Sequence, residues 1–207
     1  MRRLTPIAVA AALCAATTPA ARADALGGLD GRSADPGALP RTSAELSWVA
    51  DNDVSVLGLR ANYKLGAATV GFLSAGLTEF DESGAEGFLV GAGLYYHFAR
   101  QRVSEAVDLA IKPSFGYQGA EGNGAEVDGF VLALELLTSG RRAHPVNWYL
   151  NIGTEYSYID TNNSGSDGDL DGLIGAGVFA GVGPGQIYTG FDYSGEFGVG
   201  AGYRLFF

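Results

Sequence analysis

Two histidines are the residues of this sequence best suited to proton transfer near neutral pH, His97 and His144. A histidine that acts as a general base needs a nucleophile and an orienting carboxylate within hydrogen-bond reach. Neither histidine has such neighbours in the pattern described below, so we predict no catalytic residue and no enzyme. His97 is expected to line an interior, and His144 to lie in a solvated turn.

The segment over residues 160–171 partly matches a calcium-binding loop. Oxygen-bearing side chains fall at positions 1, 3 and 5, glycine at position 6 and a carboxylate at position 12. However, Asp171 replaces the usual bidentate glutamate, and Asp167 stands where an apolar residue is usual. We predict an exposed acidic loop without metal or cofactor, with calcium binding as the alternative. The glycines of residues 175–185 form no phosphate loop, since no helix follows them.

The elements that would position these groups begin after a targeting segment. Arg2 and Arg3 precede an apolar stretch, and Ala21-Arg22-Ala23 matches an A-x-A cleavage site. Residues 1–23 are therefore predicted to be a secretory signal peptide cleaved near Ala23, with a short helix of a cytosolic protein as the alternative. Residues 24–41 show no periodicity and are expected to be a flexible periplasmic lead-in. The single cysteine, Cys14, lies in the removed segment.

From residue 42 onward, apolar side chains alternate with small or polar ones, which is the period of a β-strand. The alternation is clearest over residues 43–48, 88–98, 106–117, 146–158 and 197–207, and weaker over 54–64, 68–78, 127–137, 170–182 and 186–194. Breaks at Val56–Leu57 and Leu173–Ile174 are interpreted as bulges or misplaced strand ends. The pattern predicts an all-β fold over residues 42–207: a closed, antiparallel, up-and-down transmembrane barrel of about ten strands, within a range of about eight to twelve.

One face of each predicted strand is apolar, and the other is small and thinly polar. The 32 glycines suit a narrow interior. A soluble barrel or sandwich would alternate in the same way, but its solvated face should carry many lysines, glutamates and threonines. We expect opposite charges in the interior to pair and plug it, with a selectivity lining for a narrow pore as the alternative. The residues predicted to line the lumen are Glu45, Arg60, Asn62, Asp108, Lys112, Glu135, Tyr149, Glu155 and Arg204.

The connections between the predicted strands fall into two chemical classes. Those near residues 50–53, 79–87, 119–126, 160–169 and 194–196 are acidic; those near 64–67, 99–105 and 138–145 carry basic residues, and 183–185 is uncharged. With the N-terminus in the periplasm, the acidic connections would lie on the outer side of the membrane. Aromatic residues gather near both strand ends, as in the girdles of membrane barrels. Without the signal peptide, 10 basic residues remain against 23 acidic ones, which argues against nucleic acid as a partner.

The last strand, Gly198-Val-Gly-Ala-Gly-Tyr203-Arg-Leu205-Phe-Phe207, resembles the C-terminal signal of bacterial outer-membrane proteins. In that family, alternating hydrophobic residues and the terminal phenylalanine, here Tyr203, Leu205 and Phe207, are recognised by the barrel-assembly machinery. The resemblance implies this machinery as a partner and insertion into the outer membrane, among lipid and lipopolysaccharide. Surface carboxylates could bridge to lipopolysaccharide phosphates through divalent ions.

Residues 42–207 are similar to the small OmpA/OmpX-type barrels and, more loosely, to YfaZ-like proteins. The resemblance implies a porin-like barrel of the Gram-negative cell envelope. The leading functional prediction is a structural or surface-interaction role with a mostly plugged, narrow lumen. A narrow channel for small solutes is the alternative, followed by an outer-membrane enzyme. No oligomeric state is predicted.

Overall fold

The computed structural model describes residues 42–51, 54–80, 85–99, 107–122, 125–140, 146–162 and 165–207. The predicted signal peptide and lead-in, and His144, lie outside the described residues. Among those residues, no helix is long and apolar enough to cross a bilayer.

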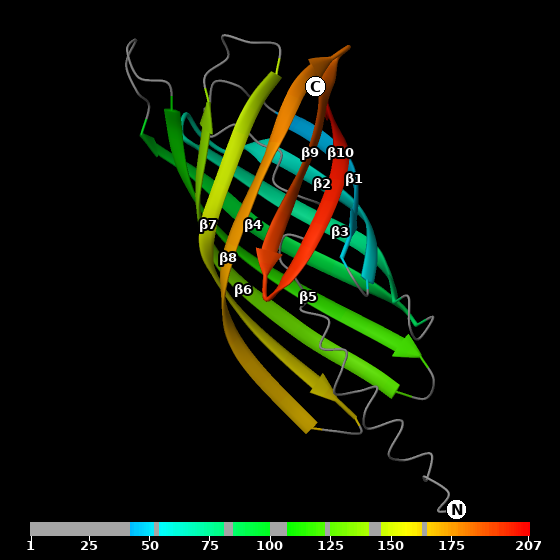
Figure 1. The fold of residues 1–207 in the computed structure, drawn as a ribbon. Helices are drawn as coiled ribbons and strands as arrows, with labels where there is room; N and C mark the ends of the chain where they lie inside the picture. The colour runs from blue at the N-terminus through cyan, green and yellow to red at the C-terminus, as the bar shows by residue number, and fades with distance from the viewer. Residues whose placement is uncertain are drawn as a thin grey trace, which may run out of the picture.

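Ten strands form one closed antiparallel barrel, in which each strand pairs with its neighbour in sequence and β1 pairs with β10 (Figure 1). This confirms the predicted fold class and strand number. The strands are β1 (Thr42–Ala50), β2 (Val54–Lys64), β3 (Thr69–Phe80), β4 (Glu86–Ala99), β5 (Val107–Gly122), β6 (Ala125–Gly140), β7 (Val146–Thr161), β8 (Gly165–Val182), β9 (Gly185–Ser194) and β10 (Glu196–Phe206).

Buried and exposed side chains alternate along the strands, because successive side chains of a strand point to opposite faces of the barrel wall. In β1, Ser43, Glu45, Ser47 and Val49 are buried, whereas the residues between them are exposed. The exposed set is apolar, with Leu46 52% and Trp48 50% exposed. In this strand the charged group lies inside the barrel, and the large hydrophobic groups lie on its outer wall.

The two breaks in the alternation are not bulges, and that interpretation was wrong. Val56 is buried inside the barrel and Leu57 is exposed outside it, and the registers of β2 with β1 and β3 run without interruption. Leu173 and Ile174 alternate in the same way within β8. The pattern seemed to break because both faces are apolar at these points. The register shifts instead between β4 and β5, at His97 and Ala99.

The two ends of the barrel differ in height. We call the end that holds the start of β1 and the end of β10 the terminal end; there the Phe207 amide donates to the Thr42 carbonyl over 3.0 Å. At the opposite end, which we call the tall end, β7 and β8 run on past the turn between β9 and β10 (Figure 1). The predicted connection at 160–169 is therefore mostly strand, because β8 already begins at Gly165 and pairs with Thr161.

Candidate functional site: the barrel interior

All nine residues predicted to line the lumen have buried side chains, each at most 4% exposed. They come from β1, β2, β5, β6, β7 and β10. The structure divides most of them between two charged groups, one across the β1–β10 seam and one on β5 to β7, as described next.

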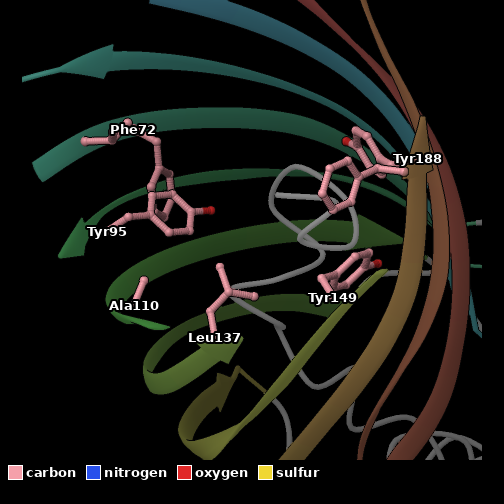
Figure 2. Packing of buried hydrophobic residues seen from close by; sticks show 8 residues of the cluster. Phe72, Tyr95, Ala110, Leu137, Tyr149 and Tyr188 are labelled. Atoms are coloured by element: carbon pink, nitrogen blue, oxygen red, sulfur yellow. The ribbon is translucent and has the colours of Figure 1, made fainter. Parts of the chain in front are cut away.

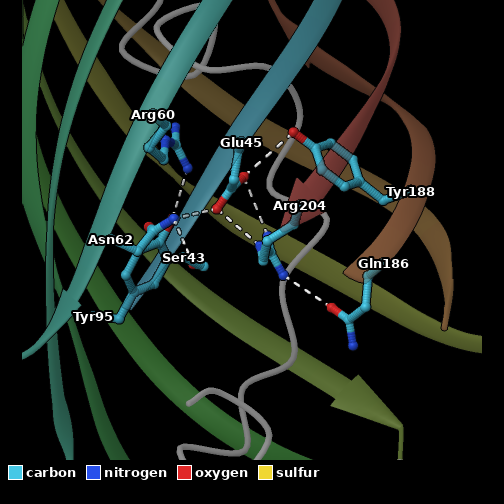
Figure 3. Close-up of polar contacts among 8 residues, drawn as sticks. All are labelled: Ser43, Glu45, Arg60, Asn62, Tyr95, Gln186, Tyr188 and Arg204. Carbon is cyan, nitrogen blue, oxygen red and sulfur yellow. Dashed lines mark hydrogen bonds and ion pairs between the residues drawn. The ribbon is translucent and has the colours of Figure 1, made fainter. Parts of the chain in front are cut away.

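Glu45 is the centre of the first group, which joins β1 to β10 (Figure 3). Arg204 donates from Nε to Glu45 Oε1 over 2.8 Å and from Nη2 to Oε2 over 3.3 Å, so the ion pair has two contacts. The Tyr188 hydroxyl donates to Oε2 over 3.3 Å, and the Asn62 amide donates to Oε1. One carboxylate thus accepts hydrogen bonds from three strands besides its own. Such saturation offsets the desolvation of a buried charge.

Arg60 extends this group toward β4. Its Nη1 donates to the Tyr95 hydroxyl over 2.8 Å, and its guanidinium carbon lies 4.5 Å from the centre of the Phe72 ring. Arg204 lies similarly over the Tyr188 ring, at 5.5 Å. Planar guanidinium groups stack favourably on aromatic faces. The Phe72 and Tyr188 rings, together with Glu45, therefore help to stabilise the two buried positive charges.

The second charged group lies on β5, β6 and β7. Lys112 Nζ is 2.5 Å from Glu135 Oε1, and the Asn151 amide donates to Oε2 of the same carboxylate over 2.8 Å. Glu155 accepts a hydrogen bond from the Ser194 hydroxyl of β9 over 3.2 Å. Each of these buried carboxylates has a donor aimed at it, as buried charge requires.

Apolar side chains complete the interior at this level, and they come from seven strands, β3 to β9. Figure 2 shows Phe72 and Tyr95 on one wall, Tyr149 and Tyr188 on the other, and Leu137 between them, all pointing inward. The members of this cluster are Val70, Phe72, Tyr95, Ala110, Leu137, Tyr149, Phe179 and Tyr188.

The tyrosine rings fit because the neighbouring strands carry glycine. A Cβ atom placed on Gly177 or on Gly190 would lie 2.4 Å from the Tyr149 hydroxyl oxygen, and one placed on Gly202 would meet the Tyr188 ring at the same distance. Real side chains do not approach so closely, so each ring occupies the space that a Cβ would need. These three glycines of the inner face therefore admit the two tyrosine rings.

The sequence prediction missed most of the interior rings. Phe72, Tyr95 and Tyr188 are at most 5% exposed, yet they were not among the predicted lining residues. Each of them stands at an inward-facing position of the two-residue alternation in β3, β4 or β9, and this position could have identified it. A second missed cluster lies toward the tall end: Val49, Val54, Val56, Phe80 and Leu89.

The structure also describes the other residues that the sequence suggested for chemistry, His97 and most of the segment 160–171. His97 is 4% exposed, and its backbone amide donates to the Ala68 carbonyl over 2.8 Å. Residues 160–162 and 165–171 belong to the β7–β8 hairpin, so side chains there alternate between two faces; Ser164, a position of the predicted calcium loop, lies outside the described residues. Within the described ranges, no three His, Cys, Asp or Glu side chains come together as a metal site.

No protein-family model and no curated protein matches the sequence. Several solved barrels are similar in fold. The translocator domain of autotransporter NalP from Neisseria meningitidis is 13% identical, with 80% of this chain and 87% of that chain covered and a TM-score of 0.45. The KdgM porin is 12% identical, with 80% and 99% covered and a TM-score of 0.39. The N-terminal barrel domain of Pseudomonas aeruginosa OprF is 17% identical, with 79% and 96% covered and a TM-score of 0.37.

Proposed function

We propose that this chain is an integral barrel of the bacterial outer membrane, that its interior is closed to solutes, and that its role is structural or one of surface contact. The observation that carries the membrane assignment is the inverted polarity of the barrel. Its outer wall exposes Leu73, Leu77 and Leu59 at 68%, 66% and 61%, while Glu45, Lys112 and Arg204 inside are at most 2% exposed. A barrel that faced water would have the reverse arrangement.

The distribution of rings on the outer wall supports the same assignment. Aliphatic residues such as Leu134 and Ile152 occupy the middle of the strands, and aromatic side chains lie toward both ends, as in membrane barrels. Some rings form a contact ladder around Phe130, whose centroid lies 5.2 Å from that of Tyr158 and 6.5 Å from that of Phe115. The exposed rings are Trp48, Phe88, Phe115, Tyr156, Phe191, Tyr193 and Phe197 toward the tall end, and Tyr63, Tyr96, Phe98, Trp148 and Phe207 toward the terminal end.

The packing of the interior supports a closed lumen. The largest fully buried side chains of the described barrel include Arg204, Tyr95, Tyr149, Tyr188 and Lys112, each at most 2% exposed. Bulky groups that line an open pore would be wetted. Here the three tyrosines belong to one packed cluster from three strands, and Arg204 lies over the Tyr188 ring. Arg204 and Lys112 are paired with carboxylates.

Conductance in planar bilayers tests the closed interior. We expect no steady openings from the wild-type protein. Tyr149→Ala, which removes a ring that spans two glycines, is expected to give small openings, and the exposed Leu150→Ala on the same strand is the control that should remain silent. Steady wild-type openings would instead support the narrow channel.

Heat-dependent migration on a gel tests the barrel in a membrane. The folded protein, extracted from outer-membrane vesicles, is expected to migrate differently before and after boiling. A protein that stays in the soluble periplasmic fraction would overturn the membrane assignment. We further propose that Tyr203, Leu205 and Phe207 guide insertion by the assembly machinery. Phe207→Ala should then slow accumulation of the heat-modifiable form in cells, with refolding from urea unchanged.

A further inference from the structure

At the tall end of the barrel, part of β8 has a neighbouring strand on only one side within the described part of the chain. β8 pairs with β7 along almost its whole length, from Gly165 opposite Thr161 to Ala180 opposite Val146. Its pairing with β9 begins only at Ile174, opposite Tyr193. Among the described residues, no strand pairs with the other side of residues 165–173, which extend past the β9–β10 turn as a free edge. In Figure 1 this overhang lies below that turn.

The hydrogen-bonding direction of this edge follows from its partner strand. The Asn162 amide, just past the end of β7, donates to the Glu126 carbonyl of β6. Because successive peptide groups of a strand point to opposite sides, odd-numbered residues of β7 face β8, and their partners in β8 are also odd-numbered. The peptide groups of Ser166, Gly168 and Leu170 consequently point away from β7, to the side where β9 is missing.

Two aspartates already interact with this edge. The Gly168 amide donates to Asp167 Oδ1 over 2.9 Å, and the Leu170 amide donates to Asp169 Oδ1 over 2.8 Å. With Asp171, these aspartates place a carboxylate at every second residue, on one face of the strand. Residues 153–173 contain five acidic residues and no lysine or arginine. The edge thus offers backbone hydrogen bonds in a row, next to a row of negative charges.

We propose that residues 165–173 are a docking site for an extended cationic segment of another protein, which adds to β8 as a further strand. Such strand addition takes its affinity from main-chain hydrogen bonds and its specificity from alternate side chains. A neutral strand would have to displace Asp167 and Asp169 from the amides and leave both carboxylates without a new partner. A strand with Lys or Arg at every second position supplies carbonyls to the amides and cations to the carboxylates.

The same charges disfavour a second copy of this chain as the occupant. Two β8 edges that paired with one another would bring aspartates close across the strands, and like charges opposite one another are destabilising. Natural sheets protect their edges with charges for this reason. The aspartates therefore disfavour self-association and uncharged strands, and they favour a cationic strand.

The test uses the full-length folded protein in detergent micelles and labelled nine-residue peptides. A peptide with lysine at alternate positions is expected to bind about tenfold more tightly than a peptide of the same composition with its lysines clustered, since up to three cross-strand charge pairs are lost. N-methylation of alternate peptide amides on the strand-pairing side should abolish binding with charge unchanged. Hydrogen exchange should show new protection within residues 165–173.

Two variants locate the site. Asp167→Asn with Asp169→Asn is expected to remove the preference for the alternating lysine peptide, and Asp160→Asn in the same hairpin is the control that should keep it. Equal binding of the N-methylated peptide would overturn the proposal, as would binding without protection of residues 165–173 or no binding of the alternating peptide. A dimer of the protein alone that Leu170→Pro dissolves would assign the edge to self-association and overturn it as well.

Discussion

The interior of this barrel has two arcs at the same level that are built differently. Across the seam, β1, β2 and β10 contribute Glu45, Arg60, Asn62 and Arg204, held by directional hydrogen bonds. Along the wall, the cluster from β3 to β9 is mainly apolar and is held by ring packing. The seam joins Glu45 and Arg204, which are 159 residues apart in the sequence, whereas the wall joins strands that follow one another in the chain.

The difference reflects what each arc must specify. Wall strands are joined by short connections that limit their register. The first and last strands have no such connection, and a slip of one residue would turn Arg204 from the interior toward the apolar outside. A buried ion pair is a weak source of net stability, but it penalises wrong alignments strongly. We infer that the Glu45–Arg204 pair fixes the register at which the barrel closes.

The most severe way to break the seam is Glu45→Ala. The change leaves Arg204 buried without its carboxylate and also removes the acceptor of Asn62 and Tyr188. We expect a loss of about 3–5 kcal/mol in the free energy of unfolding, measured by urea titration in lipid vesicles with tryptophan fluorescence. Glu45→Arg combined with Arg204→Glu should recover part of the loss. If Glu45→Ala unfolds at the wild-type urea concentration, the seam role is wrong.

A break in the wall is expected to cost less. Leu137 is fully buried in the apolar cluster, and Leu132 on the same strand is 49% exposed on the outer wall. Leu137→Ala should lower the free energy of unfolding by about 2–4 kcal/mol through lost contacts and a cavity. Leu132→Ala, its matched control, should change it by well under half of that amount. Equal effects of the two substitutions would contradict a packed interior.

The fit of rings on glycine can be tested by adding one methyl group. A Cβ on Gly177 would lie 2.4 Å from both the Tyr149 hydroxyl and the Thr189 carbonyl oxygen, whereas one on Gly181 would meet nothing within 4 Å. Gly177→Ala is expected to cost about 1–3 kcal/mol, and Gly181→Ala close to nothing, in the same urea titration. A tolerated Gly177→Ala would show that the Tyr149 ring and the backbone at Thr189 can both move aside.

The smallest effect is expected outside both arcs. The Tyr117 hydroxyl donates to Asp128 Oδ1 over 2.5 Å on the exposed wall near the tall end. Tyr117→Phe should lower the free energy of unfolding by about 0.5–1 kcal/mol, because water can replace an exposed hydrogen bond. An effect as large as that of Leu137→Ala would mean that the outer rim limits stability and the interior does not.

Strand positions and faces could be predicted from the sequence because alternation is a local property. The weak segment predicted over residues 54–64 coincides with β2, Val54–Lys64. The early start of β8 could not be predicted in this way, because glycine and aspartate have low strand propensity. Residues 165–171 are extended because β7 pairs with them; the Tyr156 hydroxyl lies over Gly168, where a Cβ would be 2.7 Å away.

The sequence could not predict which side chains contact one another inside the barrel. Parity predicted that Arg60 faces inward, but the residue it contacts, Tyr95, lies two strands away. Which side chains meet across a barrel depends on the tilt and stagger of all the strands together. For the same reason, Val56 and Leu57 looked like a break in the alternation, since the cluster that accommodates the inward-facing Val56 is formed by β1, β3 and β4 as well.

The ring of Tyr149 has a consequence for how this protein can change over evolutionary time. It occupies the space that a side chain at Gly177 on β8 or at Gly190 on β9 would need. The residues at these three positions, on three strands, therefore compete for the same space. A homologue that gains a side chain at either glycine position must shorten the residue at position 149 and also shift the strand backbone, because the Thr189 or Ala176 carbonyl oxygen lies 2.4 Å from the Cβ position. Joint substitution at these positions would therefore be the sign, in diverged relatives, that the same closed interior has been inherited.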